Sequence, residues 1–387
     1  MTKHQSKIEK LIAELCPNGV EYKDIETLIK NKTVLTVSPP KKLTKIHFKK
    51  VGTFPIVDQG QNFIVGYTDD SNATILNGLY VIFGDHTEAI KYVDFTFAQG
   101  ADGIKILKTS ADMIDIKFFY YALNNFYKKT GRYTRHFSFL KKTQIPVPPL
   151  AVQEEIVKIL NNFTELEAEL EAELEARKKQ YEHYRYSLLT ANEGTKSVEL
   201  ASIANYSKTR IAASELNAES YVGVDNLLQD RKGKTISNYV PKTGKLTCYD
   251  IGDILIGNIR PYLKKIWRAT NVGGTNGDVL VIRVNDLEKN NLRGSFLYHL
   301  LASDSFFNYN MQNAKGAKMP RGNKKAIMKY KISVPLISVQ ERIVKILDKF
   351  DALVNDISIG LPAELTARRQ QYEYYRNKLL TFDEYVR

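Results

Sequence analysis

The sequence has little cysteine, because Cys16 and Cys248 are the only two among 387 residues. Two thiols this far apart in sequence form neither a zinc site of ordinary ligand spacing nor a disulfide framework. Long apolar runs are also missing, since no stretch approaches the roughly 20 apolar residues that span a membrane. Residues 1–9 are polar and lack the apolar centre of a signal peptide. We therefore expect a cytoplasmic protein in a reducing compartment, with no membrane partner.

The common catalytic signatures are absent as well. The sequence contains no GxxxxGKS/T phosphate loop, no HExxH zinc motif and no GxSxG nucleophile elbow. Residues 84–88 (GDHTE) combine an imidazole with two carboxylates, but no second cluster completes a site, so polar loop residues are the simpler interpretation. The glycine-rich residues 273–278 lack the lysine of a phosphate loop. We expect no catalytic residue and no metal site in this chain.

Positive charge is in excess. The chain has 56 Lys and Arg against 43 Asp and Glu, a formal net charge of +13. Such a balance favours a polyanionic partner, although a basic but otherwise ordinary enzyme has the same composition. The length allows two or more domains, and a hydrophobic content of 43% lets each domain bury a core.

The strongest feature is an internal repeat. Residues 145–166 (IPVPPLAVQEEIVKILNNFTEL) and 332–353 (ISVPLISVQERIVKILDKFDAL) are identical at 13 of 22 positions. Residues 176–190 (ARKKQYEHYRYSLLT) and 367–381 (ARRQQYEYYRNKLLT) are identical at 10 of 15 positions. Self-similarity of this kind indicates a duplicated unit.

Each copy has the apolar spacing of a long helix, with apolar residues at steps of three and four. The first helix is expected over residues 152–189, about 57 Å at 1.5 Å per residue. A helix this long needs a partner for its apolar stripe, and the second copy supplies one. Because a whole domain separates the copies, we predict an antiparallel coiled coil. The predicted pairing residues are Ile156, Leu160, Phe163, Leu166 and Leu170 in the first copy and Ile343, Leu347, Phe350, Leu353 and Tyr372 in the second.

The second copy differs from the first in its middle. It is four residues longer there and contains Gly360 and Pro362. Proline breaks a helix internally but suits the first helical turn. We therefore predict a kink or a break, with a new helix starting near Pro362.

The repeat sets the domain layout, which we predict as an α+β chain of five segments. A short helix and turn (residues 1–19) precede a first small mixed α/β domain (20–144) and a first helical spacer (145–197). A second small mixed domain (198–331) and a second spacer (332–387) follow. Each domain is expected to contain a buried strand that runs into a glycine-containing loop (79–85 and 253–258). A further strand (104–107 and 279–282) and an aromatic-rich helix (118–127 and 296–309) come next.

Two basic segments occupy the same place in the repeat, directly before each spacer. Residues 128–142 and 315–325 contain no acidic residue, and neither do residues 30–50 and 258–268. Basic side chains among Gly, Thr and Asn suit phosphate contact and base reading, since Arg pairs with guanine and Asn with adenine. A solvated basic loop is the alternative for each segment alone. The candidate DNA-binding residues are Arg132, Thr134, Arg135, His136 and Lys141 in the first domain and Arg260, Lys264, Lys318, Arg321, Asn323 and Lys324 in the second.

Residues 165–175 (ELEAELEAELE) have the opposite charge. A helix this acidic cannot lie along phosphates, so the middle of the first spacer is expected to face away from nucleic acid or to contact a basic partner. A simple solvated helix face is the alternative.

The chain resembles the specificity subunits of type I restriction-modification systems over almost its whole length. The resemblance is carried by IPVPPLAVQEEIVKIL, ISVPLISVQERIVKIL and the two ARxxQYExYR blocks, with residues 15–22 and 83–87 in support. It implies two variable target-recognition domains that each read one half of a split double-stranded DNA target. It also implies helices that set the gap between the halves.

The same resemblance implies the partners. Such subunits carry no active site and scaffold two methylation subunits, which in turn hold the translocase-nuclease subunits. S-adenosylmethionine, ATP and Mg²⁺ are then expected in the partner subunits and no cofactor in this chain. Three alternatives stay open at this stage: a self-contained methyltransferase or nuclease, a coiled-coil adaptor without sequence preference, and an RNA-binding protein.

Overall fold

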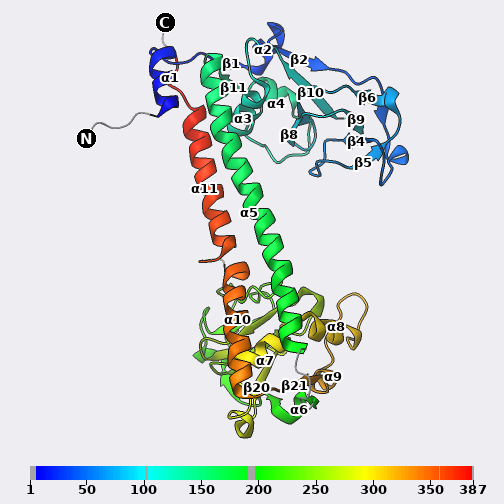
Figure 1. Cartoon of the computed structure of the whole chain (residues 1–387), viewed down its shortest axis with the longest axis vertical. Coiled ribbons are helices and arrows are strands. Elements are labelled where there is room, and N and C mark those ends of the chain that lie inside the picture. Colours follow the sequence, from blue (N-terminus) through cyan, green and yellow to red (C-terminus); the bar gives the residue numbers. More distant parts are fainter. Residues whose placement is uncertain (1–5, 101–102, 191–196, 357, 386–387) are drawn as a thin grey trace, which may run out of the picture. The chain divides into compact units, whose positions relative to one another are not determined.

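The computed structural model describes residues 6–100, 103–190, 197–356 and 358–385 (Figure 1). The chain divides into two compact units. The first unit comprises residues 1–168 and 368–387, and the second comprises residues 169–367. Each unit therefore combines one globular stretch with parts of both helical repeats.

The first unit is built on an antiparallel sheet with the order β2-β10-β7-β8. These strands are β2 (Val34–Val37), β10 (Ile104–Thr109), β7 (Tyr80–Gly84) and β8 (Ile90–Val93). Strand β7 is buried along its whole length, as its continuous apolar sequence predicts. The helix α3 (Ile116–Phe126) packs on this sheet through Phe118, Phe119 and Leu123, which are fully buried.

A second sheet in this unit has the order β3-β9-β4-β5, and β6 pairs with β9. Its strands are β3 (Lys42–Leu43), β9 (Phe97–Gly100), β4 (Phe54–Val57), β5 (Gly66–Thr68) and β6 (Thr74–Ile75). The strands β1 (Tyr22–Asp24) and β11 (Gln144–Pro146) pair and so join the start of the domain to its end. The short helices are α2 (Ile25–Lys30), α4 (Phe137–Lys141), η1 (Lys45–His47) and η2 (Ser71–Ala73).

The second unit repeats this topology although its sequence is different. Its main antiparallel sheet has the order β13-β20-β17-β18, from β13 (Ala204–Tyr206), β20 (Val279–Val284), β17 (Ile254–Gly257) and β18 (Ile266–Arg268). A second sheet has the order β14-β16-β19-β15, from β14 (Arg210–Ala212), β16 (Lys245–Tyr249), β19 (Gly273–Thr275) and β15 (Tyr221–Val222). The strands β12 (Ser197–Glu199) and β21 (Lys331–Ser333) pair as β1 and β11 do. The buried strand β17 thus corresponds to β7.

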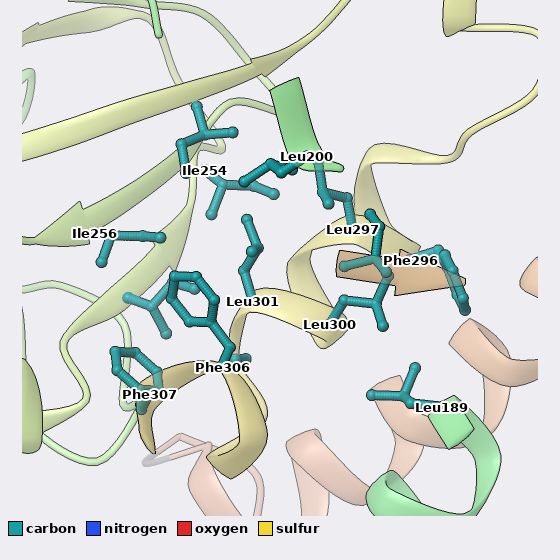
Figure 2. Close-up of a cluster of buried hydrophobic side chains, with 14 of the residues drawn as sticks. Leu189, Leu200, Ile254, Ile256, Phe296, Leu297, Leu300, Leu301, Phe306 and Phe307 are labelled. Carbon is teal, nitrogen blue, oxygen red and sulfur yellow. The ribbon is translucent and has the colours of Figure 1, made fainter. Parts of the chain in front are cut away.

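The core of the second unit joins β17 to two helices, α7 (Gly294–Leu301) and α8 (Asp304–Gln312). Figure 2 shows Ile254 and Ile256 of the strand turned toward Leu301 of α7 and Phe306 of α8. The expectation of one helix over residues 296–309 is wrong, because α7 ends at Leu301 and Ser303 caps the second helix by accepting a hydrogen bond from the Phe306 N–H at 3.2 Å. The remaining short helices are α6 (Leu200–Ile203), α9 (Lys324–Met328), η3 (Ala213–Glu215), η4 (Pro261–Leu263) and η5 (Asp286–Glu288).

The predicted helices of the two repeats are confirmed. The first is α5 (Leu150–Thr190), one continuous helix of 41 residues. The second is broken into α10 (Ile337–Asn355) and α11 (Leu361–Leu380). Pro362 lies in the first turn of α11, where its missing N–H costs no helical hydrogen bond, so the predicted break is confirmed at the predicted place.

The helices pair antiparallel within the first unit. The ring of Phe163 stacks on Tyr375 with centroids 5.5 Å apart and contacts Tyr372 at 6.3 Å. One turn further along α5, Glu167 forms an ion pair with Arg369 at 2.6 Å. Because the partner's number falls as that of α5 rises, the predicted antiparallel direction is confirmed (Figure 1).

Two predicted pairing residues lie outside the seam, which is the line of contact between the paired helices. Leu166 and Leu353 are 48% and 37% exposed. A four-residue step from the preceding phenylalanine of each copy places Glu167 and Val354 on the seam instead, and Val354 is 1% exposed. The other predicted residues are buried, half-buried or in ring contacts. Ile156, Leu160, Ile343 and Leu347 are buried, Leu170 is half-buried, and Phe350 stacks on Tyr181 at 5.9 Å.

The N-terminal helix α1 (Lys7–Leu15) is confirmed. A capping box of Ser6 and Glu9 starts it, and Ile8 faces the core. The C-terminal segment returns to the same unit, where the Val20 N–H donates to the Asp383 carbonyl at 2.8 Å and the Tyr385 N–H donates to the Val20 carbonyl at 3.0 Å. Among the described residues, no helix is long and apolar enough to cross a membrane.

Candidate nucleic-acid interface

The basic segment of the first unit begins where α3 ends and is irregular up to His136. Its far end is tied to the end of the buried strand β7. The N–H groups of His136 and Phe137 donate to Asp85, to its carbonyl at 2.7 Å and to its side-chain Oδ1 at 2.8 Å. The segment is therefore a loop anchored at the end of an inner strand of the main sheet.

The tip of this loop presents its side chains to solvent. Arg132, Thr134 and Arg135, all predicted as DNA contacts, are exposed. Between them Tyr133 is 90% exposed, and its ring stacks on His86 with centroids 5.7 Å apart and an interplanar angle of 21°. An exposed tyrosine beside two guanidinium groups offers an apolar surface and a hydroxyl for groove contacts together with cations for phosphate contacts.

The assignment of His136 as a DNA contact is wrong. Its side chain is completely buried, with Nδ1 3.2 Å from Glu88 Oε1 and Nε2 2.7 Å from the carbonyl oxygen of Arg132. The sequence misleads here because a histidine among lysines and arginines has the composition of a contact loop, whether it faces solvent or the interior.

Lys141, the last predicted contact of this domain, lies on α4 and is half-buried. Its ammonium group is 3.7 Å from Glu26 and 5.7 Å from the centroid of the Phe137 ring. Lys141 therefore stands apart from the loop tip and is partly neutralised.

In the second unit, two acid-free segments that are distant in sequence meet. Isolated β-bridges join Arg321 to Ile259 and to Lys315. The Arg260 N–H donates to the Pro320 carbonyl at 2.7 Å, and the Gly322 N–H donates to the Asn258 carbonyl at 3.0 Å. The loop that follows β17 and the loop before α9 thus form one surface, which brings together the predicted residues Arg260 and Arg321.

Arg260 and Lys264 flank the short helix η4 in left-handed conformations, with φ of 51° and 49°. Such a conformation is unfavourable for residues with a Cβ atom. Arg260 is exposed, whereas the Lys264 ammonium binds Asp304 at 2.7 Å. Burial raises the pKa of Asp304, but hydrogen bonding to Lys264 and the nearby Arg231 guanidinium outweigh it and hold that pKa below its ordinary value. Lys264 thus has an acidic partner within the protein.

The remaining predicted residues divide into exposed and structural ones. Lys318 and Lys324 are exposed, and Arg321 is exposed while its guanidinium lies 3.2 Å from Asp278. Asn323 is the N-cap of α9, where its Oδ1 accepts hydrogen bonds from the N–H groups of Lys325 and Ala326. Asn323 therefore has a helix-capping role, and its oxygen is already engaged.

Sequence reasoning missed the residues that hold the two loops. Asp85 and Asn258 both directly follow the buried central strand, and the carbonyl of each accepts an N–H from the basic loop. It also left out the exposed tyrosines beside the predicted arginines, Tyr133 and Tyr262, the second of which is 49% exposed. An aromatic residue within two positions of an arginine in an acid-free segment was the available signal for both.

A polar niche lies beneath the loop of the second unit. The Oδ1 atom of Asn258 and both amide atoms of Asn310 are buried without a hydrogen-bond partner. Gly322 covers them closely, since a Cβ atom there would lie 2.6 Å from each of the two amide oxygens. The absence of a side chain at Gly322 is therefore what lets the loop approach.

Within the part of the chain that the structure describes, no group of three or more His, Cys, Asp or Glu side chains is arranged to hold a metal ion. The two cysteines are free thiols, and burial raises the pKa of each.

Comparison with known proteins identifies relatives along the whole chain. A family model described as the type I restriction modification DNA specificity domain matches residues 23–176 and 192–367. The chain is 30% identical to the EcoR124I/EcoR124II type I restriction enzyme specificity subunit of Escherichia coli, over 97% of both chains. It is 28% identical to a putative type I restriction enzyme specificity subunit of Haemophilus influenzae, over 99% of this chain and 100% of that protein.

Solved structures share the fold. The S subunit of a type I restriction-modification system from M. genitalium superposes with a TM-score of 0.59 at 16% identity, over 94% of this chain and 96% of that one. A chain from a study of complex assembly and conformational transition of the type I system gives 0.53 at 15% identity, over 95% and 98%. The family match extends over both duplicated halves and confirms the resemblance seen in the repeated helices: the chain belongs to the type I restriction-modification DNA specificity family.

Proposed function

We propose that this specificity subunit reads an asymmetric, split DNA target, with each unit contacting one half-site through its basic loop. The observation that carries this proposal is the shared placement of the two loops. Both are attached by a backbone hydrogen bond to the residue that follows the central strand of the same sheet topology. A contact surface retained in position across two divergent domains fits a common task on different sequences.

The chemistry of the two loops differs, which supports an asymmetric target. The first loop offers Arg132, Tyr133 and Arg135, and the second offers Arg260, Lys318 and Arg321. Guanidinium groups read guanine edges and also neutralise phosphates. Two identical domains would read a palindrome, whereas these two are expected to read unrelated half-sites.

Attraction to the DNA backbone precedes reading. A net charge of +13 draws the subunit to phosphates without regard to sequence, and this part of the affinity falls with salt. The acidic face of α5 works in the opposite sense, since Glu165, Glu169, Glu171 and Glu173 are all exposed. The middle of the helical spacer is therefore proposed to stay off the DNA.

The helices are proposed to set the gap between half-sites and to dock two methylation subunits, through which translocase-nuclease subunits join. In this scheme the subunit has no active site, and the partners hold S-adenosylmethionine, ATP and Mg²⁺ in the cytoplasm. A change in the length of α5 and of its partner helices is expected to alter the gap and leave the half-sites unchanged.

The test is to express the chain with its methylation partner and to map every methylated adenine. The expected result is one motif of two defined half-sites separated by a fixed run of unspecified bases. Exchanging residues 20–144 for those of a relative is expected to change one half-site only. Absence of methylation, or methylation at one contiguous motif, contradicts the proposal.

A further inference from the structure

The carboxylate of Glu88 lies directly behind the basic loop of the first unit, residues 128–136, and is 5% exposed. It accepts hydrogen bonds from the Tyr127 hydroxyl at 2.8 Å, the Thr130 N–H at 2.7 Å and the Gly131 N–H at 3.0 Å. A buried carboxylate without partners would be strongly destabilising, so these donors are what keep it there. Glu88 also has a left-handed backbone, with φ of 57°, which side chains rarely adopt.

His136 completes the contact from the other end of the loop. Its Nδ1 lies 3.2 Å from Glu88 Oε1 and 3.3 Å from the Thr130 hydroxyl oxygen, and its Nε2 lies 2.7 Å from the Arg132 carbonyl oxygen. The His136 ring therefore links the Glu88 carboxylate and the Thr130 side chain to the backbone of Arg132.

These contacts hold both ends of the exposed stretch 132–135. Glu88 binds the backbone at Thr130 and Gly131, just before the stretch, and His136 follows it directly while binding back to the Arg132 carbonyl. Between the two anchors lie the exposed side chains of Arg132, Tyr133 and Arg135. An irregular loop without such anchors would lose conformational entropy on binding DNA, which weakens recognition.

We propose that Glu88 and His136 are positioning residues that hold the stretch 132–135 in its base-reading geometry, a role that rests on the proposed function of the first unit. Neither side chain contacts DNA in this scheme, and both act through the loop backbone. Positioning matters most for base contacts, because hydrogen bonds to base edges demand exact placement while phosphate attraction does not.

The second unit supplies an internal control. Its loop is held by backbone bridges between Lys315 and Arg321 and between Ile259 and Arg321, and the residue at its strand end is Asn258. Loss of the Glu88–His136 contacts is therefore expected to affect reading of one half-site and to leave the other unchanged.

The test uses three substitutions in the full chain, assembled with its methylation partner. Glu88→Gln places an amide N–H against the Gly131 N–H and removes the charge facing His136. His136→Asn keeps a donor near Nδ1, toward Glu88, and loses the Arg132 contact, whereas His136→Gln keeps a donor near Nε2, toward Arg132, and loses the Glu88 contact. Asp253→Asn in the second unit is the matched control, because it removes a buried carboxylate that binds Arg283 at 2.6 Å.

The measurement is affinity for duplexes that carry the full target, one substituted half-site or no target, at several salt concentrations. In Glu88→Gln, discrimination at the first half-site is expected to fall about tenfold or more, the scale of one lost base contact. Each His136 substitution is expected to cause a smaller loss. Discrimination at the second half-site, non-specific affinity and its salt dependence are expected to match the wild type. Asp253→Asn is expected to leave the first half-site unaffected.

Three outcomes overturn the proposal. The first is unchanged discrimination at the first half-site in Glu88→Gln and both His136 variants. The second is an equal loss at both half-sites. The third is a loss of discrimination that scales with the fall in melting temperature in every variant, Asp253→Asn included. That result would show that the contacts only stabilise the fold. If the wild-type complex itself shows no split target, the proposed function fails instead, and that result is distinguishable because it appears without any substitution.

Discussion

Gln153 and Gln340 make the same set of hydrogen bonds in two different domains, and both are completely buried. The Gln153 Oε1 accepts from the Asp115 N–H at 2.9 Å, and the Gln340 Oε1 accepts from the Arg293 N–H at 2.9 Å. Each Nε2 donates to two carbonyl oxygens, one of them the proline five residues earlier. The repeated VQE motif therefore fastens the recognition-domain helix to the start of each spacer.

The equivalence predicts a matched loss of stability. Gln340→Ala leaves the Arg293 N–H and two carbonyl oxygens buried without partners, and each such group costs about 1–3 kcal/mol. We expect the free energy of unfolding to fall by about 2–4 kcal/mol in this variant and by a similar amount in Gln153→Ala. Denaturant titrations measure both changes. Gln312→Ala, at an exposed position of α8, serves as the control. Wild-type stability in Gln340→Ala would contradict this reading of the motif.

The contact between the recognition-domain helix and the spacer helix contains an acid-sensitive pair in the second unit. His299 Nε2 lies 2.7 Å from Asp348 Oδ1, whereas at the equivalent place of the first unit the Tyr121 hydroxyl donates to Asn161 at 2.8 Å. Hydrogen bonding to His299 lowers the pKa of Asp348 below its ordinary value of 3.8.

A lowered carboxyl pKa stabilises the fold above the unfolded value, and this contribution is lost as the pH falls through the folded one. Acid should therefore reduce the melting temperature of the wild type more than that of Asp348→Asn, with the difference appearing below about pH 4. Scans from about pH 6 to about pH 3 measure it. Parallel curves for the two proteins would show that the pair has no such role.

Tyr133 is predicted to contribute to base reading. Its ring is 90% exposed between Arg132 and Arg135, where it can contact a thymine methyl group or hydrogen-bond to a base edge through its hydroxyl. Tyr133→Ala is expected to reduce affinity for the specific duplex about tenfold, the scale of one lost base contact, while leaving non-specific affinity unchanged, as measured by titration of labelled duplexes. Tyr374→Ala, which removes a tyrosine 63% exposed on α11, is the control. Equal affinities of Tyr133→Ala and the wild type for the target would rule the contact out.

Gly322 is predicted to control the second half-site. A methyl group there meets two amide oxygens at 2.6 Å, so Gly322→Ala requires a shift of the two buried amides or of the loop that presents Arg321, and we expect the loop to move. Discrimination at the second half-site is expected to fall, with the first half-site intact, in the same duplex titrations. Gly277→Ala is the control, because a Cβ at that position meets no atom within 4 Å. If Gly322→Ala discriminates both half-sites as the wild type does, the loop does not need this close approach.

Much of the architecture was predictable because it depends on local pattern. Three- and four-residue apolar spacing gives α5 wherever its stripe finds a partner, and Pro362 sets the start of α11 through its own ring geometry. The seam was less predictable. Glu167 occupies a seam position through its ion pair with Arg369, and no hydrophobicity pattern marks a glutamate as a pairing residue.

The candidate site was also predictable only in part. Acid-free segments at equivalent places in the repeat identified the loops that bear Arg132 and Arg321, because charge and order along the chain can be read directly. That residues 258–265 and 315–322 form one surface could not be read, because their contact is a β-bridge across a long sequence separation.

The sequence by itself determined the duplication, the long helices with their break, the basic character of the loops and the family, since each depends on residue identity and spacing. Only the tertiary structure decided that His136 is buried against Glu88, that Asn323 caps a helix and that Tyr133 is exposed. Whether a polar side chain faces solvent or the interior depends on the non-local packing around it. Residues of one type in one loop can thus take opposite roles, one presented to a partner and another holding the loop in place.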